Sequence, residues 1–171
     1  MKIAVLTISD RASRGEYEDQ TGPQVIQRLQ KLGWEVVRHT ILPDDQDGIQ
    51  TALIECCDES KLDLVLTAGG TGFSARDRTP EATLAVVEQL APGLAEAMRS
   101  GSMKKTPHAM LSRAVAGIRG TTLIINLPGS PRAAVENLEV VLPALPHAIK
   151  ILQGDPQAEQ EHRWKPPRPQ A

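Results

Sequence analysis

Short runs of branched apolar residues alternate along this chain with segments that have helical periodicity. The apolar runs cover residues 2–9, 34–42, 62–68 and 121–127, and each stops at a glycine, a proline or an aspartate. Such runs are typical of strands that are buried on both faces of a sheet. The alternation predicts an α/β fold of three layers, in which a mostly parallel sheet carries helices on both faces.

Helices are expected between these strands, at about 23–32, 49–56, 79–90, 93–103 and 133–142. In the third of them, we expect Thr79 to cap the helix and Leu84 to face inward. Pro143 and Pro146 are expected to interrupt the last one. Residues 113–120 directly precede a strand and could form a short antiparallel arm of the sheet.

The length of 171 residues suits one domain, which we expect to span residues 1–154. Residues 155–171 are polar, rich in proline and without apolar periodicity, so we expect a flexible C-terminal tail. The neighbouring Cys56 and Cys57 fit neither a disulfide framework nor a zinc site and are expected to serve packing.

Composition excludes several classes of partner. The net charge of −2 offers no overall attraction to nucleic acid or to an anionic membrane, and aromatic residues, at 2%, are too few for base stacking. The first apolar run is shorter than a signal peptide requires, and no stretch approaches the ~20 apolar residues of a membrane span. We therefore expect a cytoplasmic protein that binds neither nucleic acid nor membrane.

Residues 67–83, "TAGGTGFSARDRTPEAT", place a glycine-rich loop directly after the third apolar run. Gly69, Gly70 and Gly72 can adopt positive φ and bring their amides close to a phosphate, and Thr71 adds a hydroxyl. The loop matches neither the Walker A motif nor the dinucleotide fingerprint. A tight turn that only packs a strand against a helix therefore remains an alternative.

Polar loops follow the other apolar runs as well, and in an open parallel sheet such loops meet at one edge and bind ligands there. Asp44 and Asp77 each follow a strand, where two carboxylates could share one Mg²⁺ with ligand phosphates. The alternative is that each carboxylate only caps a turn, and for Asp10 both interpretations stay open. Basic residues in the same loops could bind phosphate or remain solvated, and these are Arg11, Arg14, Arg76 and Arg132.

The four histidines are scattered, and no serine or cysteine is arranged with them as a nucleophile. Phosphoryl and nucleotidyl transfer can proceed by positioning and charge neutralisation alone, so this pattern is compatible with such a reaction.

Several motifs together resemble the molybdopterin-binding family of molybdenum cofactor biosynthesis, the MoaB/Mog family. They occur in the family's order and cover residues 1 to about 152: "TISDRASRGEYEDQTGP", "LVLTAGGTGFSARDRTPEAT", "PGLAEAMR", "LSRAVAGIRGTTLIINLPGSP" and "LPHAIKIL". The resemblance implies that residues 1–154 are a molybdopterin-binding domain.

The resemblance further implies a nucleotidyltransferase of the adenylyltransferase type. Molybdopterin and ATP would be its substrates, Mg²⁺ would be required, and adenylyl-molybdopterin and pyrophosphate would be the products. Asp44 and Asp77 match the family's functional aspartates and would be both the catalytic residues and the Mg²⁺ ligands. By motif, the pterin and phosphate contacts fall on Ser9, Asp10, Gly69, Gly70, Thr71, Gly72, Pro128, Gly129 and Ser130.

The resemblance also implies a homotrimer and a downstream metal-insertion protein as a partner. Two alternatives stay open. One is a non-catalytic carrier of molybdopterin from the same family, and the other is an unrelated nucleotide-binding α/β domain.

Overall fold

A computed structural model describes residues 1–158 of the chain. Its centre is a six-stranded sheet with the strand order β2-β1-β3-β6-β5-β4. The strands are β1 (Lys2–Ile8), β2 (Glu35–Leu42), β3 (Leu64–Ala68), β4 (Gln89–Leu90), β5 (Ala116–Arg119) and β6 (Thr122–Leu127). β2, β1, β3 and β6 run parallel, whereas β4 and β5 extend the edge beyond β6 in antiparallel pairing. The predicted α/β fold is confirmed, and β5 is the antiparallel arm expected near residues 113–120.

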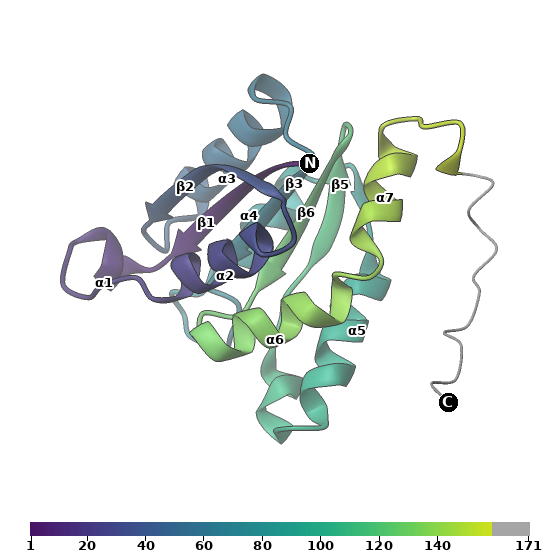
Figure 1. Ribbon diagram of the computed structural model, residues 1–171. Helices are drawn as coiled ribbons and strands as arrows, with labels where there is room; N and C mark the ends of the chain where they lie inside the picture. The colour runs from purple at the N-terminus through teal and green to yellow at the C-terminus, as the bar shows by residue number, and fades with distance from the viewer. Residues whose placement is uncertain (159–171) are drawn as a thin grey trace.

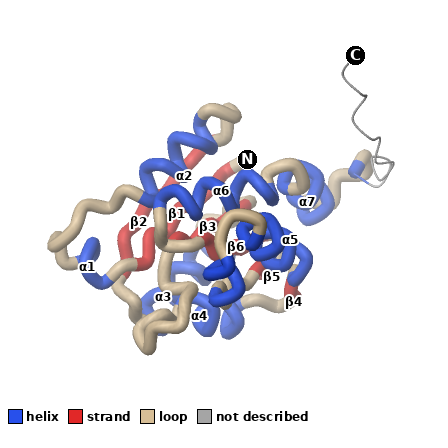
Figure 2. Tube along the Cα trace, turned by 90° about the horizontal axis from the view of Figure 1, so that it is seen from below, coloured by secondary structure: helices blue, strands red, loops and turns tan. Residues whose placement is uncertain are grey.

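Helices cover both faces of the sheet (Figures 1 and 2). One face packs against α2 (Thr21–Gln30), α5 (Pro92–Met103), α6 (Pro131–Val141) and α7 (Leu145–Leu152). The other face packs against α3 (Gln46–Ile54), the π-helical turn η1 (Glu55–Glu59) and α4 (Thr79–Val86). Two short helices, α1 (Asp10–Ser13) and the 3₁₀ helix η2 (Pro107–Leu111), lie in connecting segments. The structure thus has the three layers expected from the sequence.

Alternation along the central strands divides the core in two. In β1, Ile3 and Val5 belong to the cluster beneath α2 and α6, whereas Ala4 and Leu6 belong to the cluster beneath α3 and α4. All four are fully buried, because successive side chains of a strand point to opposite faces and both faces are covered. The edge strand β2 instead alternates between partly buried and exposed residues.

The cysteines are buried in the second cluster, as expected of packing residues. Burial raises the pKa of the Cys57 thiol to about 11, so this thiol is un-ionised at neutral pH and a weak nucleophile.

Three expectations about helices were wrong. Leu84 is 49% exposed, because α4 turns Thr79, Thr83 and Val86 toward the sheet. Thr79 does not cap α4, since its hydroxyl donates to the Gly69 carbonyl at 2.8 Å. Pro146 does not interrupt a helix either, because it lies in the first turn of α7, where proline removes no needed donor.

Within residues 1–158, no helix combines the length and the apolarity needed to cross a membrane. At the end of this range, residues 155–158 form a hydrogen-bonded turn in which Ala158 is buried. The rest of the predicted tail, residues 159–171, lies outside the described residues, so the boundary at residue 154 stays a prediction.

Candidate active site

The candidate site lies where the chain changes direction across the sheet. β1 is flanked by β2 on one side and by β3 on the other, so the loops after β1 and β3 leave the sheet on opposite sides of a crevice. Open α/β sheets bind ligands in such a crevice, beyond the carboxyl ends of the strands. A cavity of about 230 Å³ opens there, and its walls come from the loops after β1, β2, β3 and β6.

The glycine loop comes so close to β1 that no side chain fits between them. Gly69 has a φ of +119°, and a Cβ built on it would lie 2.2 Å from the carbonyl oxygen of Ile8. The Gly69 amide donates to the Leu127 carbonyl at 3.1 Å, and this bond fixes the loop between the ends of β1 and β6. At Gly70, with a φ of +61°, a Cβ would lie 2.4 Å from the Thr79 hydroxyl and 3.0 Å from Asp44 Oδ1. Gly69 therefore lets the loop backbone contact the end of β1, and Gly70 lets it contact the Asp44 carboxylate.

Asp10 and Asp44 are joined by a reciprocal pair of hydrogen bonds. The Asp10 amide donates to Asp44 Oδ2 at 2.9 Å, and the Asp44 amide donates to Asp10 Oδ1 at 3.0 Å. Arg76 donates to both Asp10 oxygens at 2.9 Å. The Asp44 amide and the Arg76 guanidinium together lower the pKa of the Asp10 carboxyl. Asp10 thus ties three loops together at the rim of the cavity and is already paired with a cation.

Asp44 and Asp77 line the same cavity from opposite loops. Burial raises the pKa of Asp44 against the lowering effect of the Asp10 amide, and the negative charges of Asp10 and Asp77 raise it further. Asp77 Oδ2 accepts from the Ser74 amide at 3.1 Å. The carboxylate oxygens of Asp44 and Asp77 are the hard donors that Mg²⁺ prefers, and the crowded negative charge favours a cation between them.

Among the described residues, no group of three or more acidic, histidine or cysteine side chains could hold a metal ion. A pair of carboxylates nevertheless suits Mg²⁺, which is usually bound by one or two carboxylates together with substrate phosphates. The residues present therefore fit a Mg²⁺ ion that arrives with a nucleotide.

The floor of this cavity carries a polar cluster that the sequence analysis missed. Thr7 donates to Asp19 Oδ2 at 2.6 Å, and the His39 ring lies 3.2 Å from the same oxygen. Asp19 Oδ1 accepts from the amides of Thr21 and Gly22 and so caps the start of α2. The Thr21 hydroxyl in turn donates to the Gly129 carbonyl at 2.7 Å. In the sequence, the segment "YEDQTGP" shows Asp19 two residues before the helix, a position from which it can cap α2. Its other partners, Thr7 and His39, lie on β1 and β2 and leave no local pattern.

A second cavity of about 270 Å³ lies on the other side of the glycine loop. Thr71, Gly72 and Pro128 form its wall toward the first cavity, and residues of α5, η2 and α6 form the rest. Leu111 and Ala109 contribute apolar surface there, and Arg99, Lys105, His108 and Asn137 contribute polar groups. Residues 69–72 therefore separate two cavities, of which only the first contains carboxylates from Asp44 and Asp77.

The predicted site residues divide between these cavities. Ser9, Asp44, Gly69, Gly70, Asp77 and Gly129 line the first, and Thr71, Gly72 and Pro128 line the second. Asp10 and Ser130 line neither. Asp10 acts at the rim as described, and Ser130 caps α6 by accepting from Ala133 at 3.4 Å.

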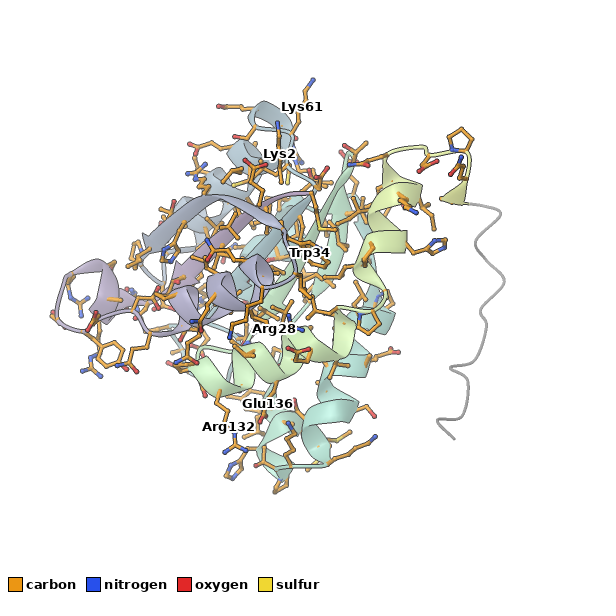
Figure 3. The ribbon with its side chains drawn as sticks, in the orientation of Figure 1. Lys2, Arg28, Trp34, Lys61, Arg132 and Glu136 are labelled. Carbon is orange, nitrogen blue, oxygen red and sulfur yellow. The ribbon has the colours of Figure 1, made fainter. Side chains whose placement is uncertain are left out.

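The candidate phosphate-binding arginines are mostly engaged elsewhere. Arg132 is 84% exposed and pairs with Glu136 one turn further along α6, where Figure 3 shows the two side chains together. Arg14 pairs with Glu16, and the Arg11 guanidinium lies 5.3 Å from the centre of the Tyr17 ring. Arg76 alone reaches a carboxylate at the rim of the cavity.

The fold and this crevice define the class: an open α/β domain built to hold a phosphate-bearing ligand at its switch point. Residues 4–147 match the family described as "Probable molybdopterin binding domain". The chain is 46% identical over 155 residues to the molybdopterin adenylyltransferase of Helicobacter pylori (strain J99), covering 90% of this chain and 88% of that protein. It is 40% identical over 169 residues to the molybdopterin adenylyltransferase of Escherichia coli (strain K12), covering 90% and 86%.

Among solved structures, the molybdopterin biosynthesis enzyme MoaB of Thermus thermophilus superposes with a TM-score of 0.86. It is 48% identical, and the match covers 91% of this chain and 98% of that one. The chain therefore belongs to the molybdopterin-binding MoaB/Mog family, as its motifs predicted.

Proposed function

We propose that this protein is a molybdopterin adenylyltransferase of molybdenum cofactor biosynthesis. The observation that carries the proposal is the pair of cavities that share the glycine loop as their common wall, one lined by Asp44 and Asp77 and the other by the basic Arg99 and Lys105. Two substrates that must react with each other need adjoining sites, and relatives with 46% and 40% identity over 90% of the chain bear this name.

We assign the triphosphate of ATP to the first cavity. The Gly70 amide supplies a donor for phosphate oxygens, whereas the Gly69 amide is held by the Leu127 carbonyl and positions the loop. The second cavity, with its apolar surface and a few polar groups, suits a flat polar heterocycle such as the pterin ring. In this arrangement, the molybdopterin phosphate approaches the α-phosphorus across Thr71 and Gly72.

In the reaction, a phosphate oxygen of molybdopterin forms a bond to the α-phosphorus of ATP, and the bond from that phosphorus to the bridging oxygen of pyrophosphate breaks. The attacking phosphate is largely ionised at neutral pH, so the chain needs no general base for it. What remains is to position the two phosphates and to offset their charge.

Asp44 and Asp77 are proposed to hold the Mg²⁺. When bound, the ion neutralises charge on the phosphates and on the departing pyrophosphate. Asp44 and Asp77 would contribute oxygen ligands, while Asp10 braces Asp44 through its amide.

Family membership further supports a homotrimer, a cytoplasmic location and delivery of the product to a metal-insertion protein. These three statements are proposals, as are the contacts of Ser9, Asp10, Pro128, Gly129 and Ser130 with the substrates.

The test is anaerobic incubation of the purified protein with molybdopterin, ATP and Mg²⁺, followed by chromatographic detection of adenylyl-molybdopterin and pyrophosphate, with EDTA as a control. Asp44→Asn and Asp77→Asn should each abolish turnover and leave molybdopterin affinity nearly unchanged. Asp45→Asn serves as a matched control, because Asp45 only caps α3. Tight binding of molybdopterin by the wild type without any product would instead assign the protein to the carrier class.

A further inference from the structure

Residues 69–78, between β3 and α4, carry the glycines and Asp77 but form no helix or strand. The two ends of this segment are anchored to each other, since Thr79 donates to the Gly69 carbonyl through its hydroxyl and to the Gly70 carbonyl through its amide. The middle of the segment is exposed from Phe73 to Arg76. A loop of this kind does not hold a carboxylate in place by itself.

Arg113 is bound to the middle of this segment from outside. Its backbone amide donates to the Thr71 carbonyl at 2.9 Å. Its side-chain Nε donates to the Gly72 carbonyl at 2.7 Å, and one terminal nitrogen donates to the Asp77 carbonyl at 2.8 Å. Arg113 therefore contacts the backbone at both residues that flank the exposed part of the loop.

The third side-chain nitrogen of Arg113 donates to Glu81 on α4. Burial of the Glu81 carboxyl favours its neutral form, but the hydrogen bond and charge of Arg113 outweigh burial, and the pKa lies below its usual value. The other carboxylate oxygen of Glu81 is buried without a hydrogen-bond partner. Arg113 thus contributes most to keeping Glu81 charged, with smaller contributions from the Glu81 amide and the Arg78 charge. The guanidinium plane is fixed by three acceptors at once.

We propose that Arg113 is a positioning residue for the adenylyl transfer, which holds the Asp77 carboxylate and the Thr71–Gly72 wall in the geometry that both substrates require. Arg113 lines a pocket on the outer side of the loop, together with Asp77 and Glu81, and it lies outside the carboxylate cavity. The inference rests on the proposed function, because the loop geometry affects turnover only if the protein catalyses adenylyl transfer.

Lysine cannot replace this arrangement. Its ammonium group is a single point of charge on a flexible stem, whereas the guanidinium presents a planar fork of donors in fixed directions. Arg113→Lys keeps the charge beside Glu81 but loses at least one of the two bonds to the Gly72 and Asp77 carbonyls.

Arg119 provides a matched control. It also donates through three side-chain nitrogens, to both oxygens of Asp58 and to the Val86 carbonyl, and it is similarly buried. Its partners lie away from the glycine loop. Arg119→Lys therefore removes comparable bonds without touching the site.

The experiment measures steady-state adenylyl transfer and local hydrogen exchange in the full chain for the wild type, Arg113→Lys and Arg119→Lys. For Arg113→Lys we expect kcat to fall about a hundredfold, the size expected for a displacement of ~1 Å at a reacting centre, with a smaller change in the KM for molybdopterin. Exchange should accelerate in peptides that cover residues 70–78 and stay unchanged in the central strands. Arg119→Lys should keep kcat within about twofold.

Equal losses of kcat in the two variants, or faster exchange throughout the Arg113→Lys protein, would show that Arg113 only stabilises the fold. Either result would overturn the inference. A wild-type protein without adenylyl transfer would refute the proposed function instead. The exchange of residues 70–78 does not depend on turnover, so unchanged exchange there in Arg113→Lys would overturn the positioning role in either case.

Discussion

Replacing Gly69 by alanine should damage both stability and catalysis, because this glycine sits at the contact between β1 and the glycine loop. A φ of +119° lies outside the conformations that alanine readily adopts, and the new Cβ would lie 2.2 Å from the Ile8 carbonyl oxygen and 3.2 Å from its carbon. Both neighbours are backbone atoms, so no side chain can rotate away. The ends of β1 and β3 must separate by about 1 Å to restore an ordinary contact.

The magnitude follows from two contributions. Holding a non-glycine residue in a rarely populated backbone conformation costs about 1–3 kcal/mol. Forcing an extra methyl into a packed site costs roughly another 1–3 kcal/mol. We therefore expect Gly69→Ala to lower the free energy of unfolding by about 3 kcal/mol, which corresponds to roughly 6–12 °C in Tm for a domain of this size. A shift of ~1 Å beside the carboxylates should also lower kcat about a hundredfold.

Urea denaturation followed by circular dichroism measures the first quantity, and the adenylyl-transfer assay measures the second. Gly33→Ala is the control, because Gly33 has a φ of +75° but no atom within 4 Å of the added Cβ. It should lose about 1 kcal/mol from backbone strain alone and keep full activity. If Gly69→Ala is no less stable than Gly33→Ala, the close approach to Ile8 does not constrain the site as described.

Three further results are expected. The pKa of Asp44 is raised in the folded state, so the folded protein binds more protons than the unfolded chain at pH values between the ordinary aspartate pKa and the raised one. Above this range the Asp44 charge therefore lowers the free energy of unfolding. In EDTA at pH 7, Asp44→Asn should raise the urea midpoint. At limiting Mg²⁺, where the metal-free protein titrates, kcat/KM for adenylyl transfer should decline on acidification at a higher pH than an ordinary aspartate would cause, and a pH–rate profile checks this. Asn126→Ala should lower the free energy of unfolding by about 3 kcal/mol in urea titration, since the buried Asn126 amide donates to Thr67 and Thr83 and its oxygen accepts from the Val115 amide.

Much of the fold was predictable because its central strands are buried on both faces, and burial on both faces leaves continuous apolar runs in the sequence. The position of the carboxylates was predictable for a related reason, since Asp44 and Asp77 follow strands whose carboxyl ends must meet at one edge. The family motifs then narrowed the class of ligand.

What could not be predicted depends on contacts between distant segments. Leu84 has the right spacing to face inward, but it lies on the exposed face of α4. The opposite face of α4 turns toward the sheet, where the Thr83 hydroxyl accepts a hydrogen bond from the buried Asn126 amide. Arg113 gave no pattern of its own, because the carbonyls that it contacts lie far away in the chain. Asp19 showed only its position before a helix, because its other partners, Thr7 and His39, lie on distant strands. The division of the site into two cavities likewise appears only when η2 and α5 are placed beside the glycine loop.

The reciprocal bonds between Asp10 and Asp44 have a consequence for how the site can vary. Each residue satisfies the backbone of the other, so a substitution at one position leaves an unpaired amide at its partner. Only a short side chain with a carbonyl oxygen, aspartate or asparagine, can serve at either position. Because the two bonds join the same two loops, losing one loosens the other, and we expect Asp10→Ala and Asp44→Ala together to cost less than the sum of the two single changes. We also expect the residues at these two positions to vary together wherever this loop pairing is kept.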